Sequence, residues 1–224
     1  MGQIITDFGG LMLFAMGQTL ILALLGLFFA CIVGLFFGIL GVVPNKACNT
    51  IETVFVDVIR GVPMIVLAYF VFFGIPYLWN SILGFKGLTL SALTAGTICL
   101  ALNCGAYMAE IIRAGIQSVD VGQMEAARSL GLSYWTAMRK VVLPQAIKTM
   151  IPTIINQFII TLKDTSILSV IGFPELVNTT KNVVAVTFKS FQAWTVAAVM
   201  YLIVITLLSR LAKNLERSLH RDRE

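Results

Sequence analysis

Residues 11–43 read LMLFAMGQTLILALLGLFFACIVGLFFGILGVV, and none of them is charged. A helix needs about 20 apolar residues to cross the hydrocarbon core of a bilayer, so this stretch can span a membrane and still tilt or protrude. The whole chain agrees, because 58% of its 224 residues are hydrophobic and only 12% are charged. A typical soluble domain carries about twice that charged share. The composition therefore weighs against a soluble protein and predicts an all-α, polytopic membrane protein.

Five apolar segments are predicted to span the membrane within a single transmembrane domain that covers the whole chain. These segments are residues 11–43, 54–78, 88–112, 141–162 and 193–211. Residues 163–192 are too polar to span and too apolar to form a simple loop. We expect short helices there, buried against protein, because irregular backbone exposed to lipid is not tolerated.

The lysines and arginines indicate which end of each span faces the cytoplasm. With the N-terminus outside and the C-terminus inside, only Lys86, Lys163, Lys181 and Lys189 of the sixteen basic residues lie outside. This bias accounts for the net charge of +5, so we expect no nucleic-acid partner. The four cysteines are scattered and the single histidine lies in the charged tail, so no metal or redox site is expected.

One polar segment stands between the third and fourth predicted spans, on the cytoplasmic side. Residues 125–144 read EAARSLGLSYWTAMRKVVLP, which predicts two short helices divided at Gly131. Ser133 is placed to cap the second helix, and Pro144 to lead the chain into the membrane. The residues alone allow two interpretations: a helical pair that docks into a groove on a soluble partner, or an amphipathic linker lying on the bilayer.

This insert resembles the EAA motif of the membrane subunits of bacterial ABC importers: E-A-A, three residues, G, nine residues, an aliphatic residue, any residue, and L-P. The matching residues here are Glu125, Ala126, Ala127, Gly131, Leu143 and Pro144, with valine at the aliphatic position as a mild departure. The segments VIRGVPMIVLAYFVFFGIP, NCGAYMAEIIRAGIQSV and LKDTSILSVIG are similar to the polar amino acid branch of these permeases.

The resemblance implies a five-span permease of the type I importer kind in the bacterial cytoplasmic membrane, which moves a polar amino acid inward. It implies that two ATP-binding subunits attach through residues 121–144. A second permease copy or a paralogue and an external solute-binding protein would complete the assembly.

The chain contains no G-x-x-x-x-G-K-[ST] motif, so it is expected to be no enzyme and to hold no cofactor. ATP and Mg²⁺ would be bound by the partner. A permease for methionine or another small solute is the alternative, and a stand-alone secondary transporter is a weaker one. An intramembrane enzyme is disfavoured, because the spans offer no nucleophile with a matching base.

Two groups of residues are candidates for binding the substrate. Asn103, Tyr107 and Glu110 lie at i, i+4 and i+7 of the third span and form one polar stripe. Polar and ionisable groups inside a membrane usually mark function, so the stripe is interpreted as the lining of a pathway. The alternative is a polar patch that holds helices together, with Glu110 paired to Arg113.

Lys163 and Asp164 end the fourth span and carry opposite charges, which suits an amino acid zwitterion. Alternatively, the lysine only complements the helix C-terminus and the aspartate caps the next helix. The family resemblance favours substrate contact.

The second span has features that suggest structure rather than binding. Asp57 and Arg60 are interpreted as an ion pair, and Gly61 and Pro63 are expected to break the helix. The small residues Gly34, Gly38 and Gly41 of the first span predict a close helix contact.

Overall fold

The computed structural model describes residues 2–85 and 87–221, with side chains up to residue 214. The described residues form helices and connecting turns and contain no strand. The α-helices are α1 (Gly2–Leu40), α2 (Lys46–Gly61), α3 (Met64–Tyr69), α4 (Ile75–Tyr77), α5 (Ala92–Gln117), α6 (Val121–Ser129), α7 (Tyr134–Ala137), α8 (Leu143–Asp164), α9 (Leu176–Thr187) and α10 (Ser190–Arg221). Short π- or 3₁₀-helical turns join several of them into longer helices.

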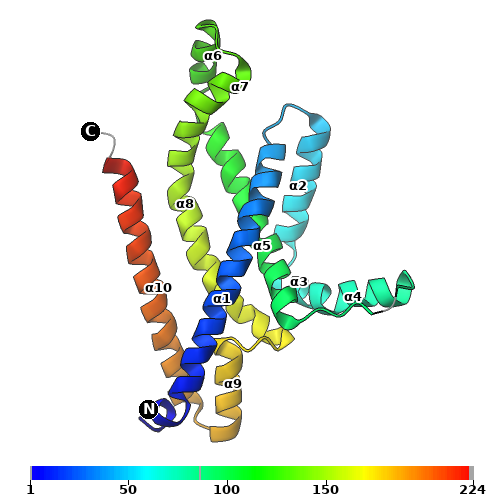
Figure 1. Cartoon of the computed structure of the whole chain (residues 1–224), viewed down its shortest axis with the longest axis vertical. Coiled ribbons are helices and arrows are strands. Elements are labelled where there is room, and N and C mark those ends of the chain that lie inside the picture. The colour runs from blue at the N-terminus through cyan, green and yellow to red at the C-terminus, as the bar shows by residue number, and fades with distance from the viewer. Residues whose placement is uncertain (1, 86, 222–224) are drawn as a thin grey trace.

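Five helical runs in the described chain are long and apolar enough to cross a membrane. They are Gly2–Leu40, Met64–Ile82, Ala92–Gln117, Tyr134–Ile171 and Ser190–Asn214. Figure 1 shows α6 and α7 at the same end of the bundle as the C-terminal end of α10, while α9 and the N-terminus lie at the opposite end. This arrangement agrees with the prediction that the insert and the C-terminus share one side of the membrane.

The bundle is built around the contact between α1 and α5, which cross at close range (Figure 1). Gly34 and Gly38 of α1 face Met108 and Ile112 of α5 with no room for a side chain between them. The predicted glycine contact is therefore confirmed for these two positions. Close approach lets the two backbones make dispersion contacts along their length, which is how helices associate in lipid.

We expect Gly34→Ala to lower the free energy of unfolding by about 1–3 kcal/mol, the usual cost of overpacking. The added methyl group would overlap Cβ of Met108 and lie 3.1 Å from the carbonyl oxygen of Gly105. Gly17→Ala on the same helix is the control, since its methyl group would meet no atom of the described residues within 4 Å. Thermal unfolding of the purified chain in detergent measures both. Equal melting temperatures for the two variants would contradict the packing argument.

The predicted second span, residues 54–78, is not one helix. Its helix breaks at Val62, which is extended (φ −94°, ψ 127°), directly before Pro63. A residue before proline is driven out of the helical region, and proline itself donates no backbone hydrogen bond. Figure 1 shows α2 lying along α1, whereas the Met64–Ile82 run leaves the bundle at a steep angle. The expected break at Gly61 and Pro63 is therefore present, and it sets the start of the apolar run.

The predicted fourth span, residues 141–162, is part of a longer helical run in the structure. The helix is continuous from Tyr134 to Ile171, so α7 already belongs to it and Pro144 does not restart the chain. A π-helical turn at Met138–Val142 precedes Pro144, which falls in the first turn of α8. Proline is well tolerated there, because the first N–H groups of a helix lack an intrahelical partner.

Short helices were expected in residues 163–192, and they are found. A 3₁₀ turn (Thr165–Ile171) ends at Gly172, whose φ of +77° allows the chain to turn into α9. The N-terminal part of α1 packs against α9 and α10 through a buried apolar cluster. Thr19 of α1 adds a hydrogen bond, because its Oγ1 accepts from the backbone N–H of Leu176 at 3.1 Å.

Candidate functional site

A cavity of about 470 Å³ opens between α2, α5 and α8. Its volume lies within the usual range for small-molecule sites. Its polar lining comes from all three helices: Arg60, Tyr107, Glu110, Ser118, Thr149, Thr153 and Gln157. The cavity therefore offers a cation, an anion and several neutral hydrogen-bonding groups to one small ligand.

Glu110 carries the negative charge of this cavity and is held between two arginines. Its carboxylate forms an ion pair with Arg60 of α2 and lies 3.8 Å from Arg113 on its own helix. Arg113 in turn approaches the buried Glu52 of α2 at 3.5 Å. The four side chains form a ladder of alternating charge that joins α2 to α5. Arg60 also lies over the ring of Tyr107, 4.8 Å from its centroid, in a cation–π contact.

These ion pairs test two interpretations made from the sequence. The predicted ion pair between Asp57 and Arg60 is wrong within the described residues, because Arg60 pairs with Glu110 instead. The pair of Glu110 with Arg113, proposed as the structural alternative, is present but shares the carboxylate with Arg60. The third glycine, Gly41, meets the side chains of Glu52 and Arg113, so its small size makes room for this ion pair.

The polar stripe on α5 is divided by the fold. Tyr107 and Glu110 line the cavity, but Asn103 does not. Asn103 is buried, and its amide Nδ2 lies 3.8 Å from Sδ of Met64 at the start of α3. The three residues share one face of α5, but α3 contacts this face at Asn103, whereas Tyr107 and Glu110 face the cavity between α2 and α8.

Lys163 and Asp164 lie about 10 Å along α8 from Gln157, the nearest cavity residue on that helix. Neither lines the cavity. Asp164 stands at the N-cap position of the 3₁₀ turn, but its side chain makes no capping hydrogen bond there, so the structural alternative for Asp164 is not supported. Lys163 does lie in the last turn of α8, as its structural interpretation requires.

Sequence reasoning missed Gln157 as a site residue. It is 6% exposed, and its amide Nε2 has no hydrogen-bond partner among the residues that the structure describes. A buried amide donor without a partner is costly, so it is available to a ligand. A signal existed in the sequence, because Thr149, Thr153 and Gln157 recur every four residues and form a polar stripe on α8.

The cytoplasmic insert presents a mixed surface. Gly131 has a φ of +85° and turns the chain between α6 and α7, and Ser133 caps α7 by accepting from the N–H of Thr136. Both predictions for these residues are confirmed. Within the EAA match, Glu125, Ala126 and Pro144 are exposed, whereas Ala127 is buried and helps to hold α6 in place. Leu143 lines an apolar groove.

The insert exposes two large apolar side chains that the six EAA positions do not include. Leu130 is 84% exposed and Trp135 is 72% exposed. Exposed apolar residues on a polar helical hairpin are typical of a docking surface.

At the opposite end of the bundle, Glu175 is a fully buried carboxylate that sequence reasoning also missed. It caps α9 by accepting from the N–H groups of Val177 and Asn178, at 2.8 and 2.6 Å. The hydroxyl of Tyr201 on α10 donates to it at 3.2 Å. Burial raises the pKa of the Glu175 carboxyl above its usual range, and these hydrogen bonds oppose the rise without cancelling it.

A raised pKa makes the folded chain bind a proton more tightly than the unfolded chain. The free energy of unfolding should therefore fall as the pH rises from about 4.3, the pKa of an unperturbed glutamate, through the folded pKa of Glu175. We expect Glu175→Gln to flatten this fall, as measured by melting temperatures in detergent between about pH 4 and pH 8. Asp120→Asn is the control, since Asp120 caps α6 but is exposed. An unchanged pH slope in Glu175→Gln would contradict the assignment.

A bundle of membrane-spanning helices around a charged cavity, with a polar helical insert at one end, has the features of a membrane transport protein. The chain belongs to the family of binding-protein-dependent transport system inner membrane components, whose model matches residues 30–221. The resemblance read from the insert is thereby confirmed. Membership implies an ATP-binding partner subunit and a binding protein.

Curated relatives cover almost the whole chain. The glutamine transport system permease protein GlnP of Escherichia coli K12 is 37% identical over 200 residues, which is 89% of each chain. The probable glutamine ABC transporter permease protein GlnM of Bacillus subtilis is 35% identical over 205 residues, covering 92% of this chain and 91% of that protein.

Solved structures confirm the fold. A crystal structure of an amino acid ABC transporter with histidines contains a chain that superposes with a TM-score of 0.86 at 36% identity, covering 96% of both chains. The MetNI methionine ABC transporter in an inward-facing conformation gives a TM-score of 0.78 at 18% identity, with 95% of this chain covered. At 18% identity, the similarity to the methionine transporter shows a shared fold only.

Proposed function

We propose that this chain is the permease subunit of an ATP-driven importer that carries a polar amino acid across the bacterial inner membrane. One observation carries the proposal: Arg60 and Glu110 place opposite charges side by side in a cavity of about 470 Å³. A free amino acid is a zwitterion and needs both charges. The relatives named for glutamine and for amino acids point to the same substrate class.

In this proposal Glu110 receives the α-ammonium group and Arg60 the α-carboxylate, so the substrate replaces the ion pair that the two make with each other. Tyr107 orders Arg60 by its cation–π contact, and Gln157 offers its unpartnered amide to the substrate side chain. The contacts proposed from the sequence for Asn103, Lys163 and Asp164 lie outside this cavity and stay predictions.

The partners are proposed from the family resemblance. Two ATP-binding subunits dock on residues 121–144 of two permease copies, or of this chain and a paralogue, and they bind ATP and Mg²⁺. Glu125, Ala126, Gly131 and Pro144 contribute to the docking surface, while Ala127 and Leu143 hold its shape. Closure of the ATP-binding subunits moves the insert as a rigid body and switches the bundle between its two access states.

The test is reconstitution of the chain with its ATP-binding subunit in lipid. We expect ATP hydrolysis to rise when one polar amino acid is added with its binding protein, and to stay low with the others. A screen of amino acids then names the substrate. Failure to form a complex, together with gradient-driven uptake by the chain alone, would identify a secondary transporter instead.

A further inference from the structure

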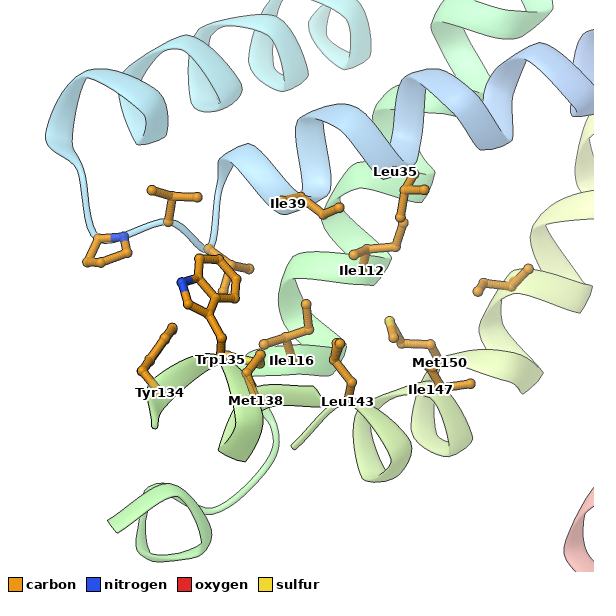
Figure 2. A pocket seen from close by; sticks show the side chains of 14 residues that line it. Leu35, Ile39, Ile112, Ile116, Tyr134, Trp135, Met138, Leu143, Ile147 and Met150 are labelled. Atoms are coloured by element: carbon orange, nitrogen blue, oxygen red, sulfur yellow. The ribbon is translucent and has the colours of Figure 1, made fainter. Parts of the chain in front are cut away.

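An apolar groove of about 430 Å³ lies at the end of the bundle that carries the insert. Figure 2 shows Leu35 and Ile39 of α1 on one side of it, Ile112 and Ile116 of α5 behind it, and Ile147 and Met150 of α8 at one end. Tyr134 and Trp135 lie at the other end. No charged residue lines the groove within the described part of the chain, and Met150 is the one residue that the groove shares with the lining of the cavity around Glu110.

The dimensions of the groove match one leaflet of a membrane. Along α8 its lining runs from Leu143 to Ile154, a rise of about 16 Å at 1.5 Å per residue. The hydrocarbon core of a bilayer is about 30 Å thick, so one leaflet is about 15 Å. A groove of this length beside membrane-spanning helices fits an extended acyl chain.

The insert end of the groove has the chemistry of a lipid headgroup site. Trp135 lines both the groove and an adjoining hollow that includes Arg139 and Lys140. Both basic side chains are exposed, and within the described part of the chain no ion pair involves either of them. Aromatic residues prefer the membrane interface, and basic residues there attract anionic lipids of the cytoplasmic leaflet.

We propose that the groove binds an anionic phospholipid of the cytoplasmic leaflet, with an acyl chain between α1, α5 and α8 and the phosphate at Arg139 and Lys140. The lipid would brace α7 against the end of α1 and so stabilise the position of the insert. A docked ATP-binding subunit is the other occupant to consider. The groove is lined by residues of three membrane-spanning runs, whereas Leu130, the most exposed apolar residue of the insert, does not line it.

Trp135 makes the proposal testable in the full-length chain. Replacing Trp79 and Trp194 by phenylalanine leaves Trp135 as the single tryptophan reporter. The probes are phosphatidylglycerol and phosphatidylcholine carrying a spin label on the acyl chain, each titrated over the same range of mole fractions in lipid nanodiscs. We expect phosphatidylglycerol to quench Trp135 fluorescence at a roughly tenfold lower mole fraction than phosphatidylcholine, because two basic residues favour the anionic headgroup.

Substitutions distinguish lipid binding at Arg139 and Lys140 from a nonspecific attraction of anionic lipid to any exposed basic residue. Arg139→Gln with Lys140→Gln should remove the preference for phosphatidylglycerol, while Lys148→Gln, an exposed basic residue of α8 outside both hollows, should keep it. Ile39→Phe, which fills the groove, should reduce quenching by both lipids. Circular dichroism checks that each variant is folded.

Two results would overturn the proposal. The first is equal quenching by the two lipids in the unsubstituted reporter chain. The second is quenching that disappears when the ATP-binding subunit is added and that survives both groups of substitutions, which would assign the groove to that subunit.

Discussion

Glu110→Gln is expected to reduce uptake at low substrate concentration by about 10- to 100-fold. A hydrogen bond to a charged group contributes about 1.5–3 kcal/mol, and the neutral amide can accept from an ammonium group but supplies no opposite charge. The same substitution leaves Arg60 without its ion-pair partner. The measurement is transport of labelled substrate into vesicles that contain the reconstituted complex. The loss should appear as a raised KM.

Asp57→Asn is the control for this prediction, because Asp57 is an exposed carboxylate on α2 that takes part in no ion pair within the described residues. It should transport normally. The charge-exchanged double variant Arg60→Glu with Glu110→Arg separates the two roles of the pair. We expect it to recover the melting temperature but not transport. The substrate ammonium group would then face a positive charge at position 110, and its carboxylate a negative charge at position 60. Full recovery of transport would show that the pair only holds α2 to α5.

Leu130→Asp should abolish co-purification of the ATP-binding subunit. Leu130 is 84% exposed at the tip of the insert, and burying a leucine side chain in an interface contributes about 1.5–3 kcal/mol. The substitution removes that contribution and places an uncompensated charge in the interface, where a few residues usually dominate the affinity. Pull-down of a tagged ATP-binding subunit measures the association, and ATP hydrolysis measures the coupling.

Asn49→Asp adds the same charge at an exposed position of α2, near the same end of the bundle but away from the insert. It should leave the association unchanged. If Leu130→Asp retained the subunit with normal affinity, docking would have to use another surface. Because Leu130 does not line the apolar groove, this result would be independent of lipid binding there.

The sequence by itself determined those features of this protein that depend on near neighbours in the chain. The uncharged run at 11–43 specifies a membrane helix, and Gly131 specifies a left-handed turn between two short helices. Gly34 and Gly38 specify a close contact, because the four-residue spacing places them on one face of a helix. Each of these follows from local geometry and from the cost of polar groups in lipid.

Only the tertiary structure decided which residues face one another across helices. It pairs Glu110 with Arg60 as well as with Arg113, and it places Gln157 in the same cavity. It separated Asn103 from that cavity, although the helical period puts it on the face of Tyr107. The period of a helix states which side chains share a face, but the crossing of α2, α5 and α8 decides what each part of that face meets.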